Sequence, residues 1–191
     1  AVQKDPKTYE HINPDEVGNA RNIVVSDQSG QSNIMSRLNA IGINIKKDDP
    51  KIKKLLHEVK DREFIGYSYD GADASFELLA RRLMGEIPRY ISINEYDVSV
   101  KKDSTGEVIS FAKAKLEVDG HEILCEGEGN GPVNALDNAI RKNVNKLEKY
   151  SEYLKDLKLV DYKVRILNTG TGAVTRVSIE SADSKHGNWF T

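Results

Sequence analysis

Three alternating glycines run directly into a predicted helix near the middle of the chain. Gly127, Gly129 and Gly131 precede Pro132, which suits a first helical position because its missing N–H would be unpaired there anyway. Glycine lets the backbone approach a neighbour closely, and the free N–H groups at a helix start favour an anion. The apolar residues that follow recur at steps of three and four, as in an amphipathic helix: Val133, Leu136, Ile140, Val144 and Leu147. This stretch therefore predicts a helix start that could receive a carboxylate or a phosphate.

The glycine pattern is also that of a plain tight connection, and this interpretation stays open. Two nucleotide-binding motifs do not fit. A dinucleotide fingerprint needs its third glycine three residues after the second, whereas Pro132 and Val133 follow Gly131 here. A phosphate-binding loop needs a Lys-Ser or Lys-Thr pair after the glycines, and neither pair is present.

The composition indicates a globular chain without a dominant charge. Its 191 residues carry 28 basic and 30 acidic side chains, so no overall field favours nucleic acid or an anionic membrane. Cys125 is the single cysteine, which excludes an internal disulfide and suits a reducing compartment. The sequence has no apolar run of membrane-spanning length and no signal-peptide pattern at its start. We expect a cytoplasmic location.

The first 87 residues read as an arm followed by helices. Residues 1–30 are polar and rich in turn residues, typical of a connecting arm. Ser32 is a candidate cap for a helix over 33–40, and Asp49 with Pro50 opens a second helix. A third helix is expected over 72–84, stopped by a glycine. We therefore predict a helical linker subdomain over 31–87.

Beyond Pro88 the apolar period changes from near 3.6 to 2, which indicates strands. Strands are expected at 91–100, 108–118 and 121–128, with a hairpin turn at Asp119-Gly120, before the helix at Pro132. The order then starts again at 160–167 and 173–179, with a third strand near Gly187. The prediction is an α+β chain whose second domain, 88–191, repeats a βββα unit and leaves the second repeat incomplete.

Three groups of residues together resemble a known family over nearly the whole chain. They are Tyr9-Glu10-His11-Ile12-x-Pro14 with Val17-Gly18-Asn19 and Ser26-x-x-Ser29-Gly30-x-Ser32-Asn33, then Gly71-Ala72-x-Ala74-Ser75-Phe76-Glu77-Leu78-Leu79, then Gly129-Asn130-Gly131-Pro132-Val133-Asn134-Ala135-Leu136. In this order they resemble the region after the catalytic barrel in the α-isopropylmalate and homocitrate synthase family, in its long-form, citramalate synthase branch.

The resemblance implies a regulatory fragment of an acyltransferase. Family members condense acetyl-CoA with a 2-oxo acid, pyruvate in the citramalate synthase branch, on a TIM barrel that carries a divalent metal and would precede Ala1. This chain would then hold no catalytic residue, metal or cofactor of its own. It would form a homodimer and bind the end product of the pathway, isoleucine or leucine, for feedback inhibition. No nucleic-acid or membrane partner is expected.

The resemblance also implies an effector site in two parts. Gly131, Val133 and Asn134 would lie at the helix start, where the N–H groups of Gly131 and Val133 suit the effector carboxylate. An apolar wall would come from Leu159, Tyr162, Ile166 and Ala173. Without the resemblance, a plain strand-face or interface core is the favoured explanation for Leu159, Tyr162 and Ile166. Asn134 stands where an acid would bind the effector ammonium more strongly.

Two further residues are implied to act in the parent enzyme. Tyr9 and His11 belong to an arm that lies near the active site in the family and contributes to a neighbouring subunit's pocket. The other histidines, His57, His121 and His186, have no metal-ligand spacing with one another or with Cys125. We expect no metal site.

Two other functions remain to be weighed. A free-standing amino-acid sensor would have the same fold without the barrel. The order αβββα is also that of a double-stranded RNA-binding domain, which needs lysines at the start of its last helix. Glu126, Glu128 and Asn134 occupy that place instead, so the charge there disfavours phosphate.

Overall fold

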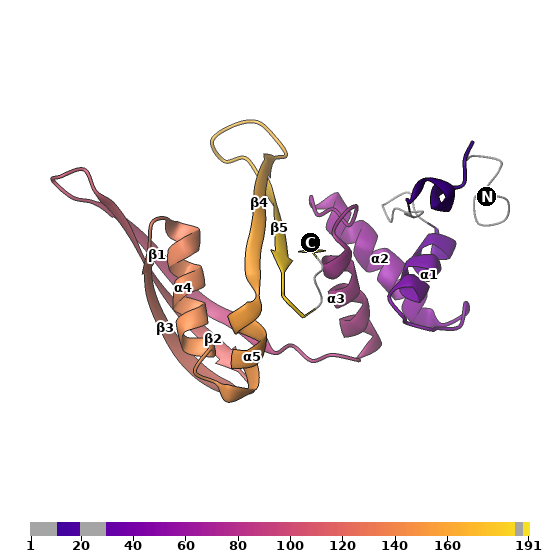
Figure 1. Cartoon of the computed structure of the whole chain (residues 1–191), viewed down its shortest axis with the longest axis horizontal. Helices are drawn as coiled ribbons and strands as arrows, with labels where there is room; N and C mark the ends of the chain where they lie inside the picture. The colour runs from indigo at the N-terminus through magenta and orange to yellow at the C-terminus, as the bar shows by residue number, and fades with distance from the viewer. Residues whose placement is uncertain (1–10, 20–29, 186–188) are drawn as a thin grey trace. The chain divides into compact units, whose positions relative to one another are not determined.

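The computed structural model describes residues 11–19, 30–185 and 189–191. By its internal contacts the chain divides into two units, 1–80 and 81–191, with the boundary inside helix α3 (Asp73–Met84). Figure 1 labels the elements. Within the described ranges, no helix has the length and apolar character needed to cross a membrane.

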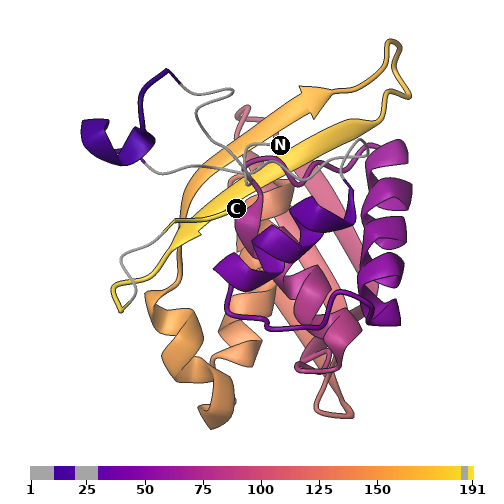
Figure 2. The same cartoon turned by 90° about the vertical axis from the view of Figure 1, so that its right-hand side faces the viewer.

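Helices build the first unit, as expected. A short 3-10 helix, η2 (Pro14–Val17), is followed by α1 (Gln31–Ala40), α2 (Pro50–Phe64) and α3, drawn in indigo to magenta in Figure 2. The carboxylate of Asp49 accepts a hydrogen bond from the Lys51 backbone N–H at 2.8 Å, which confirms the predicted cap of α2. The Ser32 cap is wrong, because α1 begins at Gln31, two residues before the predicted start, and Gly30 precedes it without a side-chain cap.

The core of this unit, among the described residues, contains one charged side chain. Arg37 is buried among apolar residues and donates from Nη1 to the Tyr69 carbonyl at 3.3 Å. Its guanidinium also pairs with Asp73 and lies 4.6 Å from the ring centroid of Phe76. These contacts satisfy a charge that would otherwise be costly to bury. The apolar core around it comprises Ile34, Leu38, Ile43, Ile52, Leu55, Val59, Tyr69, Phe76, Leu79 and Ala80.

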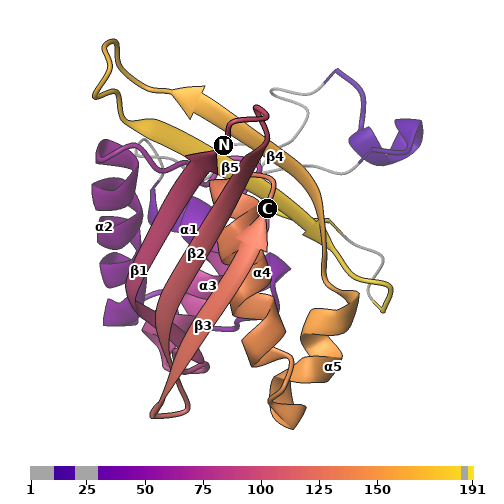
Figure 3. The ribbon, with the colours of Figure 1, turned by 90° about the vertical axis from the view of Figure 1, so that its left-hand side faces the viewer.

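The second unit starts with a three-stranded antiparallel sheet in the order β1-β2-β3, shown in Figure 3. Its strands are β1 (Ile91–Lys102), β2 (Val108–Val118) and β3 (His121–Gly129), close to the predicted ranges. Asp119 and Gly120 both have positive φ, 50° and 79°, as a two-residue hairpin turn with the matching twist requires. The predicted hairpin is therefore confirmed.

Helix α4 (Pro132–Val144) covers one face of this sheet, and its start is the predicted one. The core between them contains Cys125, whose thiol pKa is raised by burial. The opposite face carries exposed charged side chains that pair across the strands, such as Lys113 with Glu126 at 2.9 Å. The buried residues of this core are Ala112, Ala114, Leu116, Val118, Cys125, Ala135, Ala139 and Val144.

A further helix, α5 (Glu148–Asp156), was not predicted, and α4 stops at Val144 rather than continuing to Leu147. Asn143 and Asn145 flank that end, and asparagine is a poor helix former. Leu147, Tyr150 and Leu154 pack against the core of the sheet. Their spacing of three and four residues is the signal that could have revealed α5.

The second sheet has the order β4-β5-β6, with β4 (Lys158–Ile166), β5 (Thr175–Ala182) and β6 (Trp189–Phe190). The restart of the strand pattern is thus confirmed, as is the α+β class. Ala173 lies in the loop before β5 rather than in the strand, because the turn at Gly170, with φ of 107°, delays the pairing. The Val174 N–H donates to Asn168 Oδ1 at 2.6 Å and holds this loop.

Both sheets carry the same irregularity in their first strand. A register shift lies between Ile93 and Glu95 in β1 and between Leu159 and Asp161 in β4. Each shift is a β-bulge, which inserts one unpaired residue and changes which side chains share a face. When the two strands are aligned on their bulges, Tyr96 and Tyr162 occupy equivalent positions. The internal repeat is therefore present in the backbone as well as in the sequence.

Candidate functional site

The start of α4 offers backbone N–H groups that no side chain caps. Gly131 precedes the helix in extended conformation, with φ of −169°, a geometry open to any residue. A Cβ atom built on Gly131 would meet no atom within 4 Å. The helix start is therefore open, and the macrodipole and free N–H groups there favour a negatively charged group.

The two preceding glycines serve packing instead. A Cβ atom on Gly127 would lie 2.5 Å from the backbone nitrogen of Ala139, and one on Gly129 would lie 2.6 Å from that of Ala135. Real side chains do not approach a backbone so closely, so both positions need glycine for α4 to lie against β3. The interpretation as a tight connection is correct for Gly127 and Gly129, and only Gly131 faces open space.

Asn134 is committed to the turn between β3 and α4. Its Oδ1 accepts from the Asn130 backbone N–H at 3.2 Å and from Asn138 Nδ2 at 3.5 Å. Asn138 Nδ2 also donates to the Glu128 carbonyl at 2.8 Å. An amide oxygen already shared by two donors is a weak partner for a ligand's ammonium group. Asn134, which stands where an acid would bind an ammonium group more strongly, thus uses its side-chain oxygen to hold the turn.

Three of the four predicted wall residues share one face of β4. The bulge at Val160 places Leu159, Tyr162 and Ile166 on the same side, although a strict alternation would separate the first two. Their side chains are 55%, 39% and 70% exposed. Tyr162 pairs across the sheet with Ile179, which is also exposed. Ala173 is half-buried in the loop between β4 and β5 and lies off this face.

The two parts of the predicted site are separate in the described chain. Gly131, Val133 and Asn134 lie together at the start of α4, with Val133 and Asn134 exposed. No extensive packing in the described ranges joins α4 to β4 or β5. A ligand that touches both parts therefore has to bridge them.

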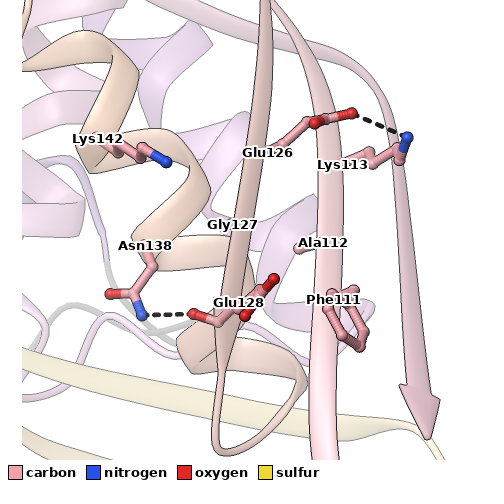
Figure 4. A pocket seen from close by; sticks show the side chains of 8 residues that line it. All are labelled: Phe111, Ala112, Lys113, Glu126, Gly127, Glu128, Asn138 and Lys142. Carbon is pink, nitrogen blue, oxygen red and sulfur yellow. Dashed lines mark hydrogen bonds and ion pairs between the residues drawn. The ribbon is translucent and has the colours of Figure 1, made fainter.

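A shallow hollow of about 560 Å³ lies elsewhere, between α4 and the edge of the first sheet (Figure 4). Lys113 and Glu126 form an ion pair at its wall, and the bond between them raises the pKa of Lys113 and lowers that of Glu126. None of the predicted site residues lines it. Its lining consists of Phe111, Ala112, Lys113, Glu126, Gly127, Glu128, Asn138 and Lys142. Because Lys113 and Glu126 already pair with each other, we do not assign a ligand to it.

Of the two residues implied to act in the parent enzyme, the structure describes one. Tyr9 lies outside the described residues. His11 is exposed ahead of η2, whose start is capped by Asn13 Oδ1 accepting from the Asp15 N–H at 3.4 Å. The role of both residues remains a prediction.

The described chain is thus a helical region followed by a β-rich region with a repeated strand pattern. Comparison with known families agrees. Residues 70–191 match the LeuA allosteric (dimerisation) domain, and residues 1–64 match the homocitrate synthase post-HMGL domain-like family. The chain belongs to the LeuA allosteric (dimerisation) domain family.

Three similar proteins are all named (R)-citramalate synthase. The chain is 45% identical over 194 residues to the (R)-citramalate synthase of Aquifex aeolicus and 42% identical to that of Geobacter sulfurreducens. The match to the (R)-citramalate synthase of Synechocystis is also 42% identical, over 197 residues. All three matches cover 100% of this chain but only 35–36% of the relative. The chain thus spans about a third of the length of these relatives.

Proposed function

We propose that this chain is the regulatory and dimerising region of a citramalate synthase, and that it binds a branched-chain amino acid as feedback effector. The match of its whole length to (R)-citramalate synthases carries the proposal. In the parent enzyme, an acyltransferase, the metal-bearing barrel would perform the condensation, and this chain would alter its rate. A single buried cysteine is in keeping with the cytoplasm.

The open start of α4 supports a carboxylate site. It combines uncapped N–H groups with a glycine whose Cβ position is empty. The exposed face of Leu159, Tyr162 and Ile166 supplies an apolar surface for a branched side chain. Shape discrimination between leucine and isoleucine is worth only about 1–3 kcal/mol, so both are candidates.

The second sheet supports a homodimer. Its apolar face includes Tyr162, Val164, Val177 and Ile179, all at least 39% exposed. The β4–β5 hairpin, to which β6 adds only two residues, is marginally stable alone with such a face and gains from a partner surface. A second copy of the chain is the partner that the family description suggests.

Calorimetric titration of the chain with valine, leucine and isoleucine tests the effector site. We expect heat and a rise in Tm with isoleucine or leucine, because a ligand that binds only the folded state stabilises it. The matched variant is Gly131→Val, whose Cβ atom meets no neighbour in the chain itself and whose side chain is placed at the position proposed for the carboxylate. Its fold should be intact and its binding lost. Absence of heat and of stabilisation with all three amino acids would refute the effector site.

Sedimentation analysis tests the dimer separately. Tyr162→Asp places a charge on the exposed face of β4 and should yield a monomer whose first sheet remains folded. A wild-type chain that stays monomeric at high micromolar concentration would contradict the dimer without bearing on ligand binding.

A further inference from the structure

Helix α5 is fixed at both ends by polar contacts. At its start, Lys149 Nζ donates to Asp119 Oδ2 at 2.9 Å and Tyr150 Oη donates to Asp119 Oδ1 at 2.8 Å, in the hairpin turn of the first sheet. Tyr150 also makes an edge contact with Tyr90, with ring centroids 6.4 Å apart. The start of α5 is therefore tied to the first sheet.

The end of α5 is tied to α4 by one arginine. Arg141 Nη1 donates to the Leu157 carbonyl at 3.0 Å and to the Leu154 carbonyl at 3.3 Å. Its Nε lies 2.9 Å from both carboxylate oxygens of Asp137, one turn earlier in α4, which orients the guanidinium. The last carbonyls of a helix have no intrahelical donor, so Arg141 satisfies groups that the chain leaves open there.

The same end of α5 also holds the second sheet. Leu157 directly precedes β4, and Leu159 is the second residue of that strand. Asp156 Oδ2 accepts from the Ser184 backbone N–H at 2.7 Å and from the Ser184 hydroxyl, just beyond the end of β5. These bonds from Ser184 hold the pKa of Asp156 below its ordinary value. Both strands of the hairpin are thus anchored at the end nearest Leu159, through a helix end that Arg141 fixes to α4.

We infer that Arg141 is a positioning residue for the effector site: it sets where the apolar face of β4 stands relative to the open start of α4. This inference rests on the proposed function, because it assumes that one ligand touches both parts. The contacts of Arg141 carry it, since they join α4 to the residues directly before β4, and α4 and β4 share no extensive packing of their own. Arg141 itself would not touch the ligand.

Three variants of the whole chain separate positioning from general support of α5. Arg141→Met removes the bonds to Leu154 and Leu157. Lys149→Met also removes one positive charge, but its contact with Asp119 is at the start of α5. Arg141→Lys retains a cation that can donate to the helix end but lacks the planar fork that Arg141 uses. All three are measured well below their Tm, so that differences in folding do not enter.

Titration with isoleucine and leucine gives the first readout. We expect Arg141→Met to weaken binding about tenfold, the scale of losing hydrogen bonds from a charged donor, with Arg141→Lys intermediate and Lys149→Met within twofold of wild type. Unchanged affinity in Arg141→Met would overturn the inference. Equal weakening in Arg141→Met and Lys149→Met would overturn it as well, because α5 would then act only as a support.

Hydrogen exchange gives a readout that needs no ligand. We expect the backbone amides from Leu157 to Tyr162 to exchange about tenfold faster in Arg141→Met than in Lys149→Met. If the wild-type chain binds none of the amino acids, the proposed function fails while this comparison still tests the anchoring. Equal exchange in the two variants would show that Arg141 does not fix the start of β4.

Discussion

The two strand repeats of the second unit share a backbone plan but differ in what covers them. In the first, Ala112 and Ala114 of β2 are buried beneath α4. In the second, the equivalent positions of β5 hold Val177 and Ile179, which are 45% and 48% exposed. Small residues on the first sheet allow a helix to approach closely, whereas larger ones on the second present an apolar surface. The same strand plan therefore forms a core covered by α4 in the first repeat and an exposed apolar face in the second.

The sharpest test of this difference compares one truncation in each repeat. Leu116→Ala removes a fully buried side chain and should lower the free energy of unfolding by about 3 kcal/mol. Ile179→Ala removes a half-exposed one and should cost less than about 1 kcal/mol in the monomer, where little packing is lost. Urea denaturation at low chain concentration measures both. Similar losses would mean that the second sheet is as well covered as the first.

A second comparison concerns the glycines before α4. Gly127→Ala forces a Cβ atom against the backbone of Ala139 and should destabilise the chain by about 2 kcal/mol through displacement of α4. Gly131→Ala meets open space and should change stability by less than about 0.5 kcal/mol. Thermal unfolding distinguishes the two. A tolerated Gly127→Ala would contradict the close packing of α4 on β3.

The helix start gives a smaller effect. Asn134→Asp keeps an oxygen that can accept from the Asn130 N–H and adds negative charge in the first turn of α4. Favourable interaction with the helix dipole should raise stability by about 0.5 kcal/mol at low salt, and the gain should decline with added salt. The same variant should bind an amino acid's ammonium more strongly. A salt-independent loss of stability would show that the Asn134 amide group is needed in the turn.

The smallest effect is a pH dependence at the hairpin that separates β2 from β3. Hydrogen bonds from Lys149 and Tyr150 lower the pKa of Asp119, so its contribution to stability is present above the unfolded-state pKa and is lost as pH falls through the folded-state pKa. Asp119→Asn should therefore lower Tm at neutral pH, and the difference from wild type should shrink on acidification from about pH 5 to pH 2. A difference that is constant with pH would exclude an ionic contribution.

Local signals predicted most elements. The Asp49-Pro50 pair marked the start of α2, Asp119-Gly120 marked the hairpin, and Pro132 marked the start of α4, because each rests on the geometry of one or two residues. Helix α5 was missed because the apolar stripe of α4 continues to Leu147 and conceals the interruption at Asn145.

Features that depend on pairing could not be predicted from local sequence. The bulge at Val160 is defined only against β5, so the shared face of Leu159 and Tyr162 emerges from the register. The different roles of Gly127 and Gly131 depend on which of them α4 touches. The contacts of Arg141 with Leu154 and Leu157 require a helix that the sequence pattern did not reveal.

The buried thiol of Cys125 is a chemical probe for opening of the first repeat. It is the only cysteine, and it lies in the core beneath α4 while the second sheet has none. A thiol reagent added in excess can therefore react only when the first repeat opens. Its rate of modification would report the lifetime of that closed state, even in mixtures with ligands or subunits that carry no thiol of their own.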